Sequence, residues 1–207
     1  MASTHKGPTK RTDAITNRAR ILQAALAVFA GRGLDLEMHE VAAQAGLGVG
    51  TLYGHFANRE ELLRAILQSV VEDALAQLRT AQSAHADDPR AALQALIATG
   101  VHLQDQYRPL SGVLRDLRLI ELMDPSYVSQ VRLQFLEVPK DLLVQGMQMG
   151  AFRRDLDQNM AAVIIMGAFI SVMDLLETYG SLDELTERLT HSLLIMLTGH
   201  AEPASEP

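Results

Sequence analysis

The chain has 207 residues, of which 48% are apolar and none is cysteine, and its formal net charge is −7. This length suffices for one large domain or for a small domain joined to a larger one, and the absence of cysteine excludes a disulfide framework and thiolate chemistry. The longest apolar run is residues 161–170, and even its extension past Ser171 to Met173 is shorter than the ~18 residues of a membrane span. Residues 1–12 lack the apolar stretch of a secretory signal, so we expect a cytoplasmic protein with no membrane partner.

The charges are distributed unevenly along the chain. Residues 1–59 carry seven Lys and Arg against four Asp and Glu, whereas the remainder carries eleven basic and twenty-one acidic residues. A basic N-terminal segment followed by an acidic remainder suggests that only the N-terminal segment binds a polyanion. We therefore expect residues 1–15, with Lys6, Lys10 and Arg11, to form a disordered basic arm; the alternative is a solvated tail without a partner.

Apolar residues recur at three-and-four spacing through most of the chain, which is the pattern of amphipathic helices. Capping residues, prolines and glycines divide this pattern into segments. No alternating stretch of convincing length indicates a strand, so the sequence predicts an all-α fold of about nine helices. The first helix is expected to begin at Thr16 or Asn17 and to end at Gly31 or Gly33. The other expected helices cover residues 37–45, 49–53, 58–82, 89–104, 109–123, 125–149, 157–179 and 181–199.

The stretch AGLGVGTLYGHFANREELL, residues 45–63, contains four of the chain's glycines. A phosphate-binding glycine loop requires a preceding strand, but the preceding segment is helical and the spacing GLGVG differs from GxGxxG. Gly46 instead suits a tight turn between two helices, because glycine adopts left-handed backbone angles easily. This pattern indicates a helix-turn-helix, whose second helix enters the DNA major groove.

The segments RARILQAALAVFAGRG and HEVAAQAGLGVGTLYGHFANREELL resemble the DNA-binding domain of the tetracycline-repressor (TetR) family, from about Arg18 to Leu63. The family consists of dimeric, ligand-responsive transcriptional regulators, most of which are repressors. The resemblance implies a three-helix DNA-binding domain at residues 16–60 and a larger helical ligand-binding and dimerisation domain at residues 61–199. We expect a disordered tail at residues 200–207.

The resemblance also implies the residues that contact an operator. Thr51 offers a hydroxyl and a methyl group that can read base edges, whereas Tyr53, His55 and Arg59 offer donors to phosphate oxygens. Tyr53 has the alternative role of a core ring, and His39 that of an exposed residue without a contact. Phe56, which has no polar atom, is expected in the core. The expected DNA contacts are Asn17, Arg18, His39, Val49, Gly50, Thr51, Tyr53, His55 and Arg59.

The sequence departs from the family pattern in the recognition helix. Relatives often have serine and a basic residue where Gly48 and Val49 stand, and a larger polar residue at Gly54. This helix therefore has fewer hydrogen-bond donors than usual. We expect more of the recognition to come from Val49 and from backbone amides, with the basic arm as compensation.

The stretch MAAVIIMGAFISVMDLLETYG, residues 160–180, covers most of the helix expected at residues 157–179, and it is apolar on every side. Such a helix must be covered from several directions. A second copy of the chain is the natural cover, as the family resemblance also implies; the alternative is a core within one chain. The expected dimer interface consists of Ile164, Ala168, Ser171, Leu175, Leu185, Leu189, Leu193 and Met196.

Seven of the nine methionines follow residue 120. Flexible thioethers suit a pocket that adapts to apolar ligands, although an ordinary core uses them as well. A mostly apolar pocket also needs a few polar groups. The expected pocket residues are His102, Gln106, Tyr107, Met123, Met147, Met166 and Met173.

No catalytic motif, metal-ligand spacing or nucleotide loop is recognisable, and the seven histidines are scattered. We therefore expect no enzymatic activity, no metal and no cofactor. The sequence predicts a homodimeric regulator that binds a double-stranded DNA operator, a repressor released by a small, largely apolar effector. A ligand-independent dimer and an activator remain alternatives.

Overall fold

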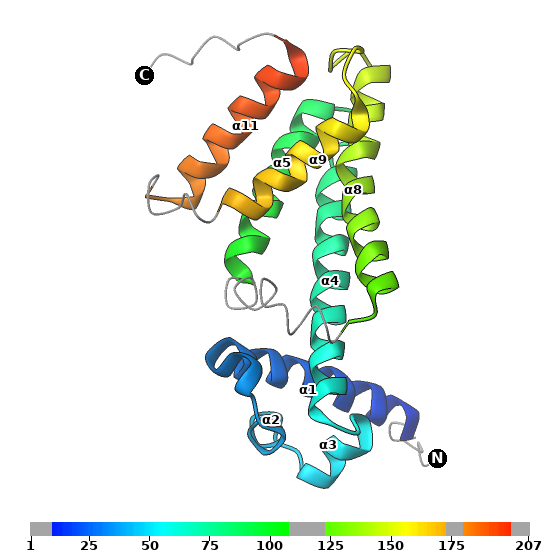
Figure 1. The fold of residues 1–207 in the computed structure, drawn as a ribbon, viewed down its shortest axis with the longest axis vertical. Helices are drawn as coiled ribbons and strands as arrows, with labels where there is room; N and C mark the ends of the chain where they lie inside the picture. The colour runs from blue at the N-terminus through cyan, green and yellow to red at the C-terminus, as the bar shows by residue number, and fades with distance from the viewer. Residues whose placement is uncertain (1–9, 108–122, 173–179, 200–207) are drawn as a thin grey trace, which may run out of the picture. The chain divides into compact units, whose positions relative to one another are not determined.

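The computed structural model describes residues 10–107, 123–172 and 180–199, and within these ranges every regular element is helical (Figure 1). The predicted all-α fold is confirmed. The segment that includes the helix expected from Pro109 lies outside the described residues. The elements are α1 Lys10–Arg32, the 3-10 helix η1 Gly33–Asp35, α2 Met38–Gln44, α3 Val49–His55, α4 Arg59–Ser83, α5 Pro89–Gln106, α8 Pro125–Gln148, α9 Gln158–Val172 and α11 Leu182–Thr198.

The first helix begins earlier than expected. Helix α1 starts at Lys10, so the prediction that Thr16 or Asn17 caps its first turn is wrong, and residues 10–15 are helical rather than part of a disordered arm. No proline or glycine occurs between residues 10 and 30, and polar residues such as Thr and Asn cost a helix interior only about 0.5 kcal/mol each. Nothing in the sequence therefore interrupts the helix at Thr16.

Side-chain caps are present at the starts of α4, α5 and α11. The backbone N–H of Glu61 donates to Asn58 Oδ1 at 2.8 Å, and the Glu61 carboxylate accepts from the N–H of Ala57 at 2.8 Å. Asp88 caps α5 by accepting from two backbone N–H groups, and Ser181 caps α11 by accepting from the N–H of Glu184 at 3.1 Å. Such caps typically stabilise a helix by ~1 kcal/mol.

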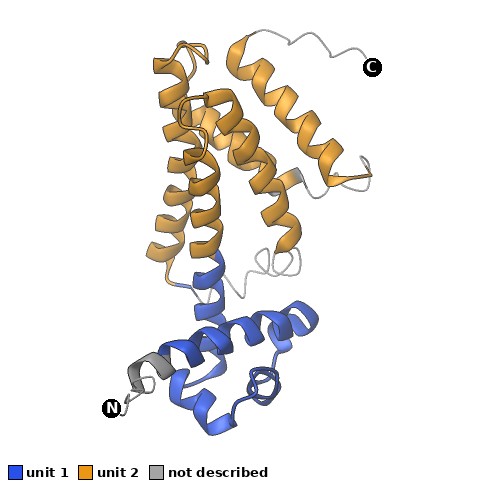
Figure 2. Ribbon diagram, turned by 180° about the vertical axis from the view of Figure 1, so that it is seen from behind, with its two compact units in different colours: residues 1–70, 109–123 blue, residues 71–108, 124–207 orange. Residues whose placement is uncertain are grey.

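The chain forms two compact units, which Figure 2 shows in different colours. The head consists of residues 1–70 and 109–123, and the body consists of residues 71–108 and 124–207. The division falls within α4, between Val70 and Val71, about ten residues after the expected boundary at residue 60.

The head has a core made by one face of each of its helices. Helix α1 packs against α2, and α2 packs against α3. Phe56 is buried, as predicted. The largest fully buried side chains of the head are Ile21, Phe29, Leu36, Leu52, Phe56, Leu62, Leu63 and Ile66.

The body core is built where α5 packs against α8, α9 and α11, and where α8 packs against α9. Two glycines allow close helix packing. A Cβ on Gly100 would lie 2.7 Å from the tip of the Phe169 ring, and a Cβ on Gly146 would lie 2.0 Å from Phe152 Cδ2. No helix in the described ranges is both long and apolar enough to span a membrane.

Candidate nucleic-acid interface

The turn between α2 and α3 is fixed by a hydrogen-bonded glycine cap. Gly46 has a φ of 63°, in the left-handed region that glycine adopts without strain. Its N–H donates to the carbonyl of Ala43 at 3.1 Å, and the N–H of Leu47 donates to the carbonyl of Ala42 at 2.9 Å. This is the Schellman arrangement that ends a helix, and it confirms the role predicted for Gly46.

An arginine from α1 holds this turn in place. Arg20 Nη2 donates to the carbonyl oxygen of Ala45 at 2.8 Å. The sequence did not predict this contact, because its partners are 25 residues apart. The bond connects the first helix of the head directly to the segment that sets the direction of α3.

Helix α3 buries one side and exposes the other. Leu52 is buried in the head core, whereas Val49 and Tyr53 are 43% and 50% exposed. Gly50 and Thr51 are exposed as well. The residue before the helix is Gly48, which has no side chain to cap it. The exposed side of α3 therefore consists of Val49, Gly50, Thr51 and Tyr53.

A groove of about 560 Å³ runs along this exposed side and brings together residues from η1, α2, α3 and α4. Four of the expected DNA contacts line it, namely His39, Val49, Tyr53 and Arg59. We call this surface the head groove. Its lining residues are Asp35, Leu36, Glu37, Met38, His39, Val49, Tyr53 and Arg59.

Some expected DNA contacts lie elsewhere on the head. The Arg18 guanidinium lies 4.8 Å from the centroid of the Phe56 ring, a cation–π contact of ~0.5–1 kcal/mol at an exposed site. Asn17 is half-buried on α1, and His55 is half-buried at the end of α3. The structure thus divides the expected contacts between the head groove, the rest of α3 and the side of α1.

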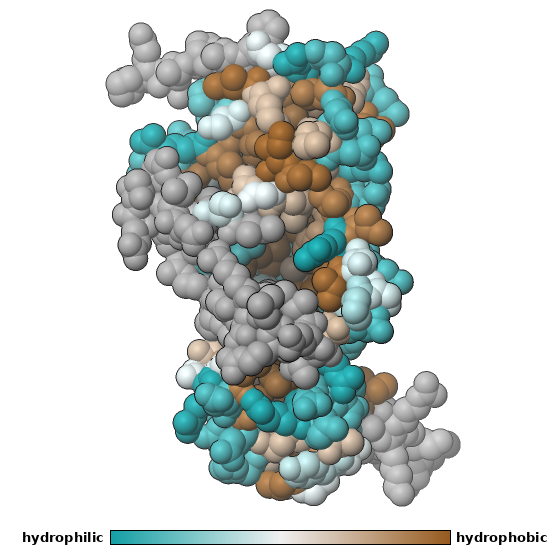
Figure 3. Space-filling view, viewed as in Figure 1, coloured by the Kyte–Doolittle hydropathy of each residue, from teal (hydrophilic) through white to brown (hydrophobic). Residues whose placement is uncertain are grey.

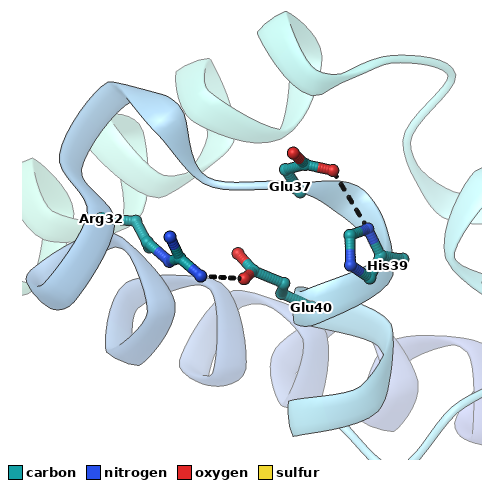
Figure 4. A network of polar contacts seen from close by, with 4 residues as sticks. All are labelled: Arg32, Glu37, His39 and Glu40. Carbon is teal, nitrogen blue, oxygen red and sulfur yellow. Dashed lines mark hydrogen bonds and ion pairs between the residues drawn. The ribbon is translucent and has the colours of Figure 1, made fainter.

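Two ion pairs lie at the start of α2 (Figure 4). His39 Nδ1 lies 3.1 Å from a carboxylate oxygen of Glu37, and Arg32 Nη2 lies 2.6 Å from Glu40 Oε1. The Glu37 and His39 side chains are 66% and 67% exposed, and exposed pairs of this kind contribute at most ~1 kcal/mol to stability. Sequence reasoning missed Asp35 and Glu37 as groove residues, although an acidic residue two positions before His39 was a visible signal.

Known proteins share the sequence of the head and the fold of most of the chain. Residues 21–66 match the family model described as "Bacterial regulatory proteins, tetR family". The HTH-type transcriptional repressor KstR2 of Mycobacterium tuberculosis is 30% identical over 145 residues, which cover 69% of this chain and 72% of KstR2. The chain belongs to the tetR family. KstR2 of Rhodococcus jostii is 29% identical over 147 residues, or 70% of this chain and 72% of that protein.

A solved structure of a tetR-family relative extends the similarity to the body. The ketosteroid transcriptional regulator KstR2 of Mycobacterium tuberculosis superposes with a TM-score of 0.65 and 26% identity, over 87% of this chain and 94% of that chain. These relatives are transcriptional regulators, and this tetR-family chain is a DNA-binding regulator, not an enzyme. Among the described residues, no three His, Asp or Glu side chains are grouped so that they could hold a metal ion.

The residues expected to form an effector pocket in this tetR-family body differ in unit and in exposure. His102 and Gln106 are exposed on α5, whereas Met147 and Met166 pack against the body core. Met123 belongs to the head unit, and Met173 lies outside the described residues. Residue type alone predicts these positions, and it does not specify the direction of a side chain.

Tyr107, the remaining expected pocket residue, is engaged with α4. Its hydroxyl donates to Asp73 Oδ2 at 2.6 Å. Partial burial, followed by this hydrogen bond and the charge of Asp73, raises the pKa of the Tyr107 phenol above its usual range. A groove of about 390 Å³ lies nearby on the body, and its lining residues are Ala76, Gln77, Thr80, Ala81 and Thr99.

The residues of α11 expected at the dimer interface differ from those of α9 in how far their own chain buries them. Leu185 and Leu193 on α11 are buried in the core of their own chain, because α11 directs its single apolar stripe toward α5. Leu189 and Met196 pack against the same core, and Leu175 lies outside the described residues. Leu185 and Leu193 therefore have apolar partners within their own chain.

Helix α9 does leave an apolar side uncovered. Ile164 is 45% exposed, Ser171 is exposed and Ala168 is half-exposed, as the prediction requires. Met160 and Val163 are also 58% and 47% exposed. Apolar surface gathers over α9 in the space-filling view (Figure 3). Since α9 is apolar all round, its own core covers one side and the other side stays exposed.

Proposed function

We propose that the chain is a homodimeric repressor that binds a DNA operator through α3 of each protomer and leaves it when a small, largely apolar effector binds the body. The observation that carries this proposal is the head groove, where His39, Val49, Tyr53 and Arg59 meet beside the exposed side of α3. Fold and family membership support the same assignment.

The side chains of the head suit the two tasks of operator binding. Thr51 and Val49 present a hydroxyl and methyl groups to base edges, and the thymine methyl is a natural partner for the apolar groups. Tyr53 and Arg59 present an O–H and a guanidinium group to phosphate oxygens, which fix the register of the protein on the duplex. Base edges and backbone would thus be contacted from one surface.

The exposed side of α9 supports dimerisation. Met160, Val163 and Ile164 form an apolar patch on one helix, and Gly167 adds no side chain that would keep a second helix at a distance. Covering such a patch with a second copy removes apolar area from water. A dimer holds two α3 helices for two half-sites about one DNA turn apart, ~34–36 Å.

A similar solved protein suggests the class of effector. The KstR2 structure is described as a ketosteroid transcriptional regulator, and this chain shares 30% identity with KstR2. We propose a bulky, mainly apolar ligand that binds the body. Such a ligand releases the operator only if it binds the DNA-free form more tightly than the DNA-bound form.

Operator binding is tested with a labelled duplex obtained by selection from random DNA, using fluorescence anisotropy. We expect Arg59→Ala to weaken binding and to reduce the slope of log affinity against log salt by up to ~0.9 per head. Arg64→Ala, an exposed arginine outside the groove lining, is the control and should change the slope less. Equal slopes for wild type and Arg59→Ala would contradict the proposed site.

Effector release is tested on the same complex with a steroid ketone and, separately, with a long-chain fatty acyl thioester. We expect one of these apolar probes to weaken operator binding by ~5- to 150-fold, the usual range of allosteric coupling. Unchanged affinity with every apolar probe would favour the ligand-independent dimer. In vitro transcription from a promoter that contains the operator distinguishes a repressor from an activator.

A further inference from the structure

The part of the head whose side chains the structure describes, residues 15–70, carries no net charge. Residues 15–70 contain five arginines, no lysine and five acidic residues. A protein gains affinity for DNA chiefly by neutralising phosphates with Lys and Arg, so a zero balance over residues 15–70, which include α2 and α3, is unusual for a DNA-binding surface. The distribution of these charges is therefore informative.

Most of the arginines already have partners within the head. Arg59, which lines the head groove, is the one that makes no hydrogen bond, ion pair or ring contact with the described residues. The other four are bound to an aromatic ring, a carboxylate or backbone carbonyl oxygens. They are Arg18 over the Phe56 ring, Arg20 on the Ala45 carbonyl, Arg32 on Glu40 and Arg64 on the Glu60 carbonyl.

Two carboxylates line the groove beside this single arginine, Asp35 from η1 and Glu37 from the residue before α2. Glu37 occupies the N-cap position, yet its side chain makes no capping hydrogen bond. It lies instead 3.1 Å from His39 Nδ1 (Figure 4). The Glu37–His39 pair is neutral when the imidazole is protonated and negative when it is not, so it adds no positive charge to the groove.

We propose that Asp35 and Glu37 limit the affinity of the head for DNA. This inference rests on the proposed function, in which the head groove faces the phosphate backbone. The two carboxylates repel phosphates and cancel the charge of Arg59 and of protonated His39. The limit keeps operator affinity within the range that an effector can reverse, because allosteric coupling changes affinity by only ~5- to 150-fold.

The test measures DNA binding by the full chain carrying Glu37→Gln or the double change Asp35→Asn with Glu37→Gln. Two duplexes of equal length serve as probes, the selected operator and a scrambled sequence. The interaction energy of two unit charges ~4–8 Å apart in water corresponds to a change of about two- to fivefold in a binding constant. We expect each substitution to tighten binding of both duplexes about two- to fivefold per head at low salt, and the gain to disappear near 1 M salt, where the Debye length is ~3 Å.

The control for total charge is Asp141→Asn, an exposed carboxylate on α8 in the body, which should leave both affinities unchanged. Melting temperatures should also stay unchanged, because Glu37 makes no capping bond. A Glu37→Gln variant that binds like wild type or like Asp141→Asn would overturn the inference. Weaker binding of both duplexes would overturn it as well, since Glu37 would then orient His39 toward a phosphate.

The Arg59→Ala variant separates this inference from the proposed function. If Arg59→Ala weakens binding while Glu37→Gln has no effect, the groove faces DNA and only the role of the carboxylates is wrong. If neither variant changes the affinity, or if the wild type binds no duplex, the proposed DNA-binding surface is wrong.

Discussion

Replacing Gly50 with alanine should stabilise the protein and weaken its operator complex. Gly50 lies in α3, and an added Cβ would meet no atom within 4 Å. Alanine in place of an exposed helical glycine stabilises the folded state by ~0.5–1 kcal/mol. For a chain of this size, this gain corresponds to a rise of about 2–4 °C in melting temperature.

The same methyl group lies on the side of α3 that we propose to enter the DNA groove. Glycine often marks a place where another backbone approaches closely, and forcing an extra methyl into a packed contact costs ~1–3 kcal/mol. Operator affinity should therefore fall by roughly five- to 160-fold per head, although the free protein is more stable.

Thermal unfolding and fluorescence anisotropy on one protein preparation measure both effects of Gly50→Ala. Gly31→Ala is the matched control, because Gly31 also has open space at its Cβ but lies in the last turn of α1. We expect this control to gain stability without losing affinity. Operator binding by Gly50→Ala that equals the wild type would refute the close approach of α3 to DNA.

Three further predictions concern the body. Gly146→Ala should lower the free energy of unfolding by ~1–3 kcal/mol, because the added Cβ would collide with Cδ2 and Cγ of the buried Phe152 ring, close to where the ring joins its own backbone. Denaturant unfolding measures this loss. Ile164→Glu should convert the dimer to monomer in analytical ultracentrifugation. The control Leu133→Glu, at an exposed residue of α8, should leave the dimer intact. A dimer that tolerates Ile164→Glu would exclude this side of α9 as the interface. The pKa of Tyr107 is raised in the fold, so the native chain keeps a proton that the unfolded chain loses near pH 10. The free energy of unfolding should therefore fall as the pH rises above about 10. This fall should be less steep in Tyr107→Phe.

The head was predictable because its signals are local in sequence. Asn58 with Glu61 fixes the start of α4, and Gly46 fixes the turn within a few residues. The alternation of buried and exposed residues along α3 also follows from a single helical stripe, with Leu52 inward and Tyr53 outward. A short stretch of chain therefore contained the information that determines the recognition helix.

The features that sequence reasoning missed depend on partners that are distant in the chain. Arg20 was recognisable as a basic residue, but its bond to Ala45 follows only from how α1 crosses the turn. Likewise, the stripe of α11 that contains Leu185 and Leu193 gave no sign of whether its own core or a second copy covers it. The spacing of apolar residues predicts which side of a helix is buried, but it does not identify the element or the chain that covers that side.

The central claim, that α3 of each protomer lies in the major groove, is tested most directly by tethered DNA cleavage. The chain contains no cysteine, so Val49→Cys offers a unique attachment site for an iron chelate that generates hydroxyl radicals. Our account predicts two clusters of strand cleavage on the operator, separated by about one helical turn, ~10 base pairs. No cleavage above the level of the same chelate attached at Asp141→Cys, on a duplex that the labelled protein still binds, would contradict it.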